Sequence, residues 1–289
     1  MASIRIELDE YEYTAGELLT GTLVVKSPYE YRFSSIRLIL SASEKTRVGS
    51  YEGGIVKVRT SWSHDEFCTE SKLHFRKEQD IQIDGSVIRG VERVPFKIEI
   101  PLGYPQTFVG EMSMVEYTLE AQVYSESTPE HCVSTNLIVR DRIPYIEPKE
   151  IIEETRGLAV KLQTDSFCIG NGLSAMIRVT EQNNIRGVRF EIINTEHARV
   201  DSYSRTITFP TIKGYLPGKK VFRDKWIGIE MELTRDVLPS TKGALFVNKN
   251  ELKITLDLAY KLDIILRIPV NLVFCKREGE CKLEFDDIF

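Results

Sequence analysis

The sequence has no long apolar run. Its 289 residues contain no stretch close to the roughly 20 apolar residues that a membrane-spanning helix requires. The N-terminus also lacks the basic and then apolar order of a secretory signal peptide. We therefore expect the protein to work in the cytosol.

Cysteines are few, and their number is odd. No secretory signal accompanies them, which favours free thiols in a reducing compartment. The last two have no histidine nearby and no second cysteine pair to complete a tetrahedral metal site, so we expect no bound metal. The five positions are Cys68, Cys132, Cys168, Cys275 and Cys281.

An excess of basic residues is also missing, because the formal net charge is −5. Binding to nucleic acid requires a basic surface that displaces condensed counterions, so nucleic acid is not an expected partner. The 42% hydrophobic and 28% charged residues are spread without biased tracts. This composition is typical of a folded globular protein.

The residue patterns of catalysis are absent as well. Four scattered histidines, no nucleophile elbow and no phosphate-binding glycine loop argue against an enzyme or a cofactor protein. An enzyme built on β-sandwiches stays open as an alternative, because fold does not fix function. It would need a deep pocket with convergent carboxylates or histidines.

The sequence does contain segments in which apolar and polar residues alternate with a period of two, as half-buried β-strands require. Clear examples in the first half are Leu19–Val25, Ile36–Leu40, Phe96–Ile100 and Tyr117–Val123. In the second half they are Leu173–Val179, Ile229–Leu233, Leu252–Tyr260 and Leu262–Ile268. Glycine and proline punctuate these segments and helical periodicity is scarce, which predicts an all-β protein of antiparallel sandwiches.

The two halves repeat one pattern. A constant offset of 154 residues aligns Tyr13, Gly16, Leu19, Gly21, Leu23 and Val25 with Phe167, Gly170, Leu173, Ala175, Ile177 and Val179. After a two-residue deletion, Ile36 aligns with Val188. We predict a duplicated fold, with one sandwich over residues 1–143, a proline-containing linker over 144–154 and a second sandwich over 155–289.

The run from Tyr13 to Val25, with its glycine-centred turn, resembles the opening of arrestin-like N-domains. Further features follow in the order typical of that family, namely Pro95-Phe96, Pro101, Gly110, the strand over 115–123, Leu238-Pro239-Ser240 and Ile268-Pro269-Val270. The resemblance covers nearly the whole chain. It is nearest to α-arrestins and the retromer arrestin-like subunit, and it implies two tandem arrestin-like, immunoglobulin-like β-sandwich domains.

The resemblance implies an adaptor or scaffold rather than an enzyme. Such a protein binds membrane-protein tails or trafficking cargo and links them to sorting, endocytic, signalling or ubiquitination machinery. Its location would be cytoplasmic, with peripheral contact to endosomal or plasma membrane. The sequence contains no Pro-Pro-x-Tyr motif for recruiting a ubiquitin ligase. An obligate structural subunit of a retromer-like or sporulation-control-like assembly is therefore the alternative.

Seven residues are candidates for partner binding. Arg5, Lys26, Lys45 and Arg47 lie in or beside N-domain strands, where they could attract acidic or phosphorylated tails. Scattered solubilising charge is the competing interpretation. Trp62 lies in a polar stretch, where it could anchor a partner or cap the sandwich.

The acidic and apolar C-terminal segment supplies the last two candidates, Phe285 and Phe289. One hypothesis is that this segment folds back onto a basic patch, with the phenylalanines as anchors and the acidic residues as charge partners. A frayed terminus is the competing interpretation and the one that we favour from the sequence.

Overall fold

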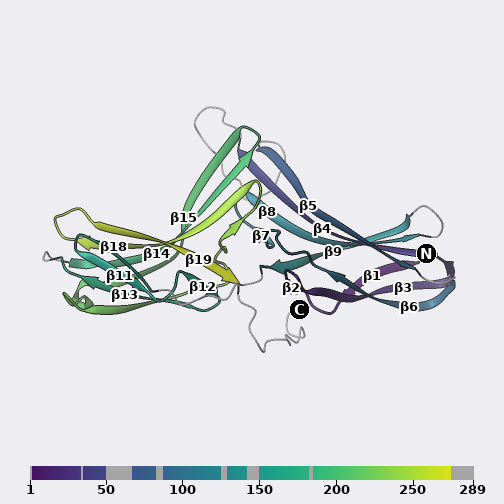
Figure 1. Cartoon of the computed structure of the whole chain (residues 1–289), viewed down its shortest axis with the longest axis horizontal. Coiled ribbons are helices and arrows are strands. Elements are labelled where there is room, and N and C mark those ends of the chain that lie inside the picture. The colour runs from purple at the N-terminus through teal and green to yellow at the C-terminus, as the bar shows by residue number, and fades with distance from the viewer. Residues whose placement is uncertain are drawn as a thin grey trace. The chain divides into compact units, whose positions relative to one another are not determined.

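The structure is a computed structural model of the chain (Figure 1) and describes residues 2–33, 35–49, 67–82, 87–124, 129–141, 150–181 and 185–274. Strands dominate these ranges, and the one helical element in them is the short 3-10 turn η2 at Gly218–Lys220. Most strand pairs are antiparallel. The predicted all-β fold of antiparallel sandwiches is confirmed. The described part contains no helix with the length and apolarity to cross a bilayer.

The strands in chain order are β1 (Ser3–Leu8), β2 (Glu12–Thr14), β3 (Leu18–Arg32), β4 (Ser35–Gly49), β5 (Phe67–Gln82), β6 (Val87–Glu99), β7 (Phe108–Val109), β8 (Ser113–Tyr124) and β9 (Pro129–Arg140). They continue as β10 (Ile151–Thr155), β11 (Leu158–Leu162), β12 (Ser166–Ile169), β13 (Gly172–Val179), β14 (Ile185–Val200), β15 (Tyr203–Pro217), β16 (Trp226–Glu232), β17 (Thr241–Lys242), β18 (Phe246–Leu258) and β19 (Ile264–Phe274).

The chain forms two compact units. Unit 1 comprises Met1–Arg142, Asn194–Phe209 and Ser240–Lys249, and unit 2 comprises Ile143–Ile193, Pro210–Pro239 and Asn250–Phe289. Unit 1 therefore includes two segments from the second half of the sequence. Of the predicted linker, residues 144–149 lie outside the described ranges and Ile151–Thr155 forms β10.

Unit 1 is built on two sheets. One has the order β1-β3-β6, and the other has the order β2-β9-β8-β4-β5 with β7 paired to β8. Along β8 every second side chain is buried, as the alternation predicts. Buried apolar side chains from both sheets form the core, and they include Leu19, Leu23, Ile36, Leu38, Phe96, Leu119 and Val123. Each contributes roughly 1.5–3 kcal/mol through removal from water.

Unit 2 repeats this plan. A sheet of order β10-β11-β13-β16 accompanies one of order β12-β19-β18-β14-β15. Its core cluster includes Leu173, Ile177, Val188, Ile192, Leu252, Leu256 and Leu272. In β13, Leu173, Ala175, Ile177 and Val179 are buried while the residues between them are more exposed.

The glycine-centred turns of the two halves have the same backbone geometry. Gly16 has a φ of 87° and Gly170 a φ of 92°, values that residues with a Cβ rarely adopt. The short strands before these turns, β2 and β12, both pair in parallel, β2 with β9 and β12 with β19. The alignment at an offset of 154 residues therefore reflects a real structural repeat.

Two expectations from the sequence are wrong in detail. Tyr260 and Leu262 do not continue strands, because β18 ends at Leu258 and β19 starts at Ile264. Both residues lie in the connecting loop, with 95% and 93% of their surfaces exposed. The alternation of apolar residues in the sequence continues through this loop, although neither strand does. Cys68 and Cys132 are free thiols, but Cys168 is disulfide-bonded, against the expectation of free thiols throughout.

Candidate functional site

The outer face of the β1-β3-β6 sheet, which lies near the N-terminus in Figure 1, carries four exposed basic side chains. Arg5 lies opposite Val24 and Val24 lies opposite Arg93, so the two arginines flank the central strand. Lys26 is two residues from Val24, and Lys97 is four residues from Arg93. Side chains at even spacing on a strand share a face. Arg5, Lys26, Arg93 and Lys97 are called the basic face below.

A carboxylate lies between the two arginines of the basic face. Arg93 Nη1 donates a hydrogen bond of 2.8 Å to Glu7 Oε2, and Arg5 Nη2 forms an ion pair with Glu7 Oε1. The hydrogen bond from Arg93 lowers the pKa of the Glu7 carboxyl, with a further contribution from Arg5. Two guanidinium groups that share one carboxylate have the geometry for recognising an external carboxylate or phosphate.

The predicted basic candidates divide between the two sheets of unit 1. Arg5 and Lys26 lie together on the basic face, whereas Lys45 and Arg47 lie on β4. Lys45 Nζ pairs with Glu116 Oε2 at 2.9 Å. Arg47 is only 7% exposed, and its Nε and Nη2 donate to the Glu111 carbonyl at 3.2 and 3.1 Å. The Arg47 guanidinium is thus directed at the backbone before β8 rather than at solvent.

Three other candidates cannot be placed. Trp62, Phe285 and Phe289 lie outside the described residues. They stay predictions from the sequence.

A buried carboxylate, which the sequence interpretation missed, holds one turn of unit 1. Glu44 on β4 is fully buried. Its Oε1 accepts the Leu245 N–H at 2.7 Å, and its Oε2 accepts the Ala244 N–H at 2.8 Å. The same Oε2 lies 2.8 Å from His74 Nε2. The Glu44 carboxylate therefore contacts two backbone N–H groups and one imidazole nitrogen, and each of these groups can donate a hydrogen bond.

A second buried carboxylate has the same kind of contacts. Glu196 on β14 is fully buried, and it accepts the Glu111 N–H at 2.9 Å and the Met112 N–H at 3.1 Å. Burial raises the pKa of the Glu196 carboxyl, and the donors around it offset only part of this effect. No basic side chain is paired with Glu196 in the described part of the chain.

The two glutamates are equivalent positions of the repeat, because the offset that aligns Ile36 with Val188 also aligns Glu44 with Glu196. The turns that they hold are equivalent too. In Gly110–Ser113 and in Gly243–Phe246 the first N–H donates to the last carbonyl, at 2.8 and 3.0 Å. The glutamate of each half thus holds the turn of the other half. We call the two arrangements the carboxylate locks.

The raised pKa of Glu196 predicts a pH dependence of stability. A carboxyl with a raised folded-state pKa favours the folded state most when protonated, so this contribution is lost as pH rises from about 4.5 through the raised value. The melting temperature of the natural protein, measured relative to Glu196→Gln, should therefore fall as pH rises. A difference that stays constant between acidic and neutral pH would contradict this assignment.

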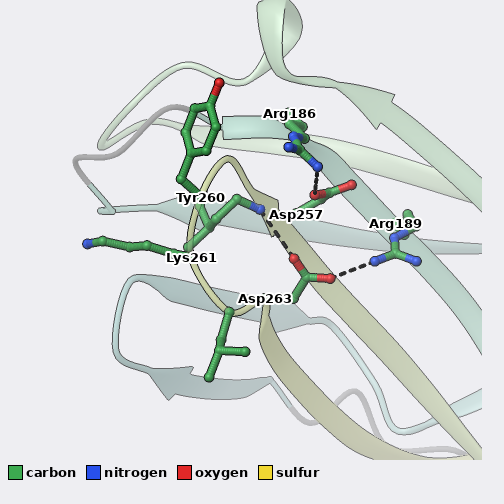
Figure 2. Close-up of a pocket in the computed structure, with 8 residues that line it drawn as sticks. Arg186, Arg189, Asp257, Tyr260, Lys261 and Asp263 are labelled. Carbon is green, nitrogen blue, oxygen red and sulfur yellow. Dashed lines mark hydrogen bonds and ion pairs between the residues drawn. The ribbon is translucent and has the colours of Figure 1, made fainter.

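Unit 2 has an open pocket at the loop that joins β18 and β19 (Figure 2). Arg189 pairs with Asp263 at 2.7 Å, and Arg186 lies 4.0 Å from Asp257. Tyr260 has 95% of its surface exposed and points away from these ion pairs. Each arginine already faces an aspartate, and Lys261, which also lines the pocket, lies 4.0 Å from Glu181. All three basic side chains of the pocket thus already have an acidic neighbour. The described residues also contain no cluster of His, Cys, Asp or Glu suited to a metal.

Comparison with known proteins agrees with this architecture. The family model described as arrestin (or S-antigen), N-terminal domain, matches residues 3–145. The match begins at β1 and ends just beyond β9. No curated protein matches the chain. Arrestin-family proteins are adaptors that bind other proteins and are not enzymes. With the matching sheets and the repeated turns, these findings show that the chain belongs to the arrestin-like family.

Proposed function

We propose that this protein is a cytoplasmic adaptor whose basic face binds acidic segments of membrane-protein tails or trafficking cargo. It would link them to sorting, endocytic or ubiquitination machinery, working peripherally at endosomal or plasma membrane. The observation that carries the proposal is the Glu7 carboxylate held between Arg5 and Arg93. The Glu7 carboxylate makes the same charge-assisted contacts with the two guanidinium groups that an acidic ligand would make.

The position of β1 supports an extended protein segment as the ligand. β1 is an edge strand of the β1-β3-β6 sheet, and an edge strand can pair its backbone with an incoming segment. An added strand would run beside Arg5, and its alternate side chains would project on the same side as the basic face. Acidic or phosphorylated residues at alternate positions would then meet the arginines.

Four positive side chains share this surface with two negative ones, Glu7 and Glu99, although the whole chain is negative. Glu99 is itself paired with Lys77 at 3.4 Å. The remaining competitor for the two arginines is Glu7. An external anion must therefore replace Glu7 or share the guanidinium groups with it.

Removing the internal competitor should strengthen binding. Glu7→Gln is expected to raise the affinity for a short peptide alternating glutamate and threonine by about threefold to tenfold, because Arg5 and Arg93 lose their internal charge partner. Fluorescence anisotropy with a labelled peptide measures the change. The matched control is Glu116→Gln, which removes the same charge beside the exposed Lys45.

Reversing the charge of an arginine on the basic face distinguishes a specific binding site from general charge attraction. Arg93→Glu should weaken the same peptide by at least about tenfold, with little effect from Lys45→Glu. A phosphoserine version of the peptide shows whether phosphate is preferred to carboxylate. Equal affinities in all variants would refute the basic face as the ligand site. Capture from cytosol with natural and Arg93→Glu proteins then tests whether trafficking partners depend on this face.

A further inference from the structure

Unit 2 has an edge strand that differs from its counterpart in unit 1. β16 is the last strand of the β10-β11-β13-β16 sheet, and it pairs with β13 without a bulge from Gly172↔Glu232 to Arg178↔Trp226. Its burial alternates strictly after Ile227, with Ile229 and Met231 buried. The other edge of β16 has no neighbouring strand in the described sheet.

The equivalent edge in unit 1 is protected against strand addition. β3 aligns with β13 at the offset of 154, so β6 and β16 are the corresponding partners. β6 contains Pro95, which has no N–H to donate, and Gly90 with a φ of 108°, which interrupts regular extension. β16 reads Trp-Ile-Gly-Ile-Glu-Met-Glu and contains neither proline nor lysine. Proline, lysine and a bulge, which commonly block an edge strand, are therefore missing from β16, and its charged residues are both glutamates.

The outer face beside this edge is acidic. Glu230 and Glu232 are exposed on β16, and neither has a basic partner among the described residues. The basic side chains of the same sheet are already engaged, since Lys161 pairs with Glu150 at 2.5 Å and Arg178 lies 3.9 Å from Glu154. The surplus negative charge is thus concentrated where backbone groups are open.

We propose that the β16 edge is a second docking site, selective for an extended basic segment of a partner protein. The segment adds as a strand beside β16 and places lysine or arginine side chains next to Glu230 and Glu232. A second copy of the chain is a poor occupant, because pairing β16 with β16 brings glutamates near glutamates. The opposite charges of the corresponding faces in the two units would give the adaptor two docking sites for different segments.

The geometry also specifies the pattern of the ligand. Outward residues alternate with inward ones along an added strand. The inward residues would lie beside Ile229 and Met231, which are each only 4% exposed, so they must be small or apolar. Gly228 has no side chain, and a Cβ placed there would meet no atom nearer than Met176 Sδ at 3.7 Å. The outer surface of β16 is therefore recessed at this position.

The probe for this site is a short peptide that alternates lysine and threonine. It should bind the full-length protein and slow amide hydrogen exchange in β16. Glu230→Lys should weaken it about tenfold, and Glu230→Gln by a smaller factor, because the exposed side chain contributes charge but little packing. The matched control is Asp165→Lys, which makes the same charge change on an exposed residue of unit 2.

The outcomes separate the possibilities. Slowed exchange in β16 together with selective loss in Glu230→Lys supports the docking site. Equal weakening by Glu230→Lys and Asp165→Lys would mean unspecific charge attraction and overturn the proposal. Absent binding, or slowed exchange elsewhere, would also overturn it. Binding of the glutamate–threonine peptide is measured in the same experiment. Because that peptide tests the basic face, failure of the β16 site and failure of the proposed function can be told apart.

Discussion

Replacing Glu44 with alanine is expected to lower the free energy of unfolding of unit 1 by about 3–5 kcal/mol. The substitution leaves the Ala244 and Leu245 N–H groups without their acceptor in a buried place, and it also removes the partner of His74. Buried donors without acceptors carry their full desolvation cost. Glu44→Gln should cost less, because an amide oxygen can still accept.

Amide hydrogen exchange in the buried strand β8 reports this change within unit 1, and thermal unfolding reports it as a fall of several degrees. The control is Glu116→Ala, which removes an exposed carboxylate paired with Lys45 and should cost less than about 1 kcal/mol. Equal losses for Glu44→Ala and Glu116→Ala would show that the buried carboxylate does not hold the turn.

Gly243→Ala is expected to cost about 2–3 kcal/mol, because no room exists for a methyl group. A Cβ at this position would lie 2.5 Å from Glu44 Oε1 and 2.6 Å from Phe246 Cε1. The corresponding Gly110 is equally close to Phe108 and Glu196. The control is Gly228→Ala, whose Cβ would meet nothing nearer than 3.7 Å.

A double-mutant cycle links these two predictions. Once Glu44 is alanine, the methyl group of Gly243→Ala no longer meets a carboxylate, so the combined loss should be smaller than the sum of the single losses. Chemical denaturation of the four proteins, followed through exchange in β8, measures the difference. Strict additivity would contradict a direct contact between residue 243 and the Glu44 side chain.

Much of the fold could be predicted because its signals are local. Alternation in β3, β8 and β13 identified both the strands and their buried sides. Gly16 and Gly170 identified the repeated turn, since both need a φ that other residues avoid. These features depend only on residues close together in sequence.

The site depends on neighbours that are distant in sequence, and alternation does not reveal them. Arg93 meets Glu7 only because β3 lies between β1 and β6. Glu44 continues the inward stripe of Ile36, Leu38 and Leu40, so a charge at an inward position was a signal that could have been used. Its repetition at Glu196 would have strengthened that signal. The turns that the glutamates hold lie far away in sequence, at residues 244–245 for Glu44 and 111–112 for Glu196, so no local pattern indicates them.

Duplication explains why the two sheets share a backbone plan and differ in charge. Inward residues are fixed by packing, so Leu19 and Leu23 have apolar counterparts in Leu173 and Ile177. Outward side chains are not constrained by packing, so the sign of their charge can change without destabilising the core. The two docking sites proposed above would therefore arise by divergence of outer faces alone, with the repeated core unchanged.

Hydrogen exchange of the full-length protein, with and without the glutamate–threonine peptide, tests the central claim most directly. The account predicts slower exchange in β1, with the effect strengthened in Glu7→Gln and lost in Arg93→Glu. Slowed exchange that avoids β1, or that persists unchanged in Arg93→Glu, would contradict the assignment of the basic face as the site for acidic protein segments.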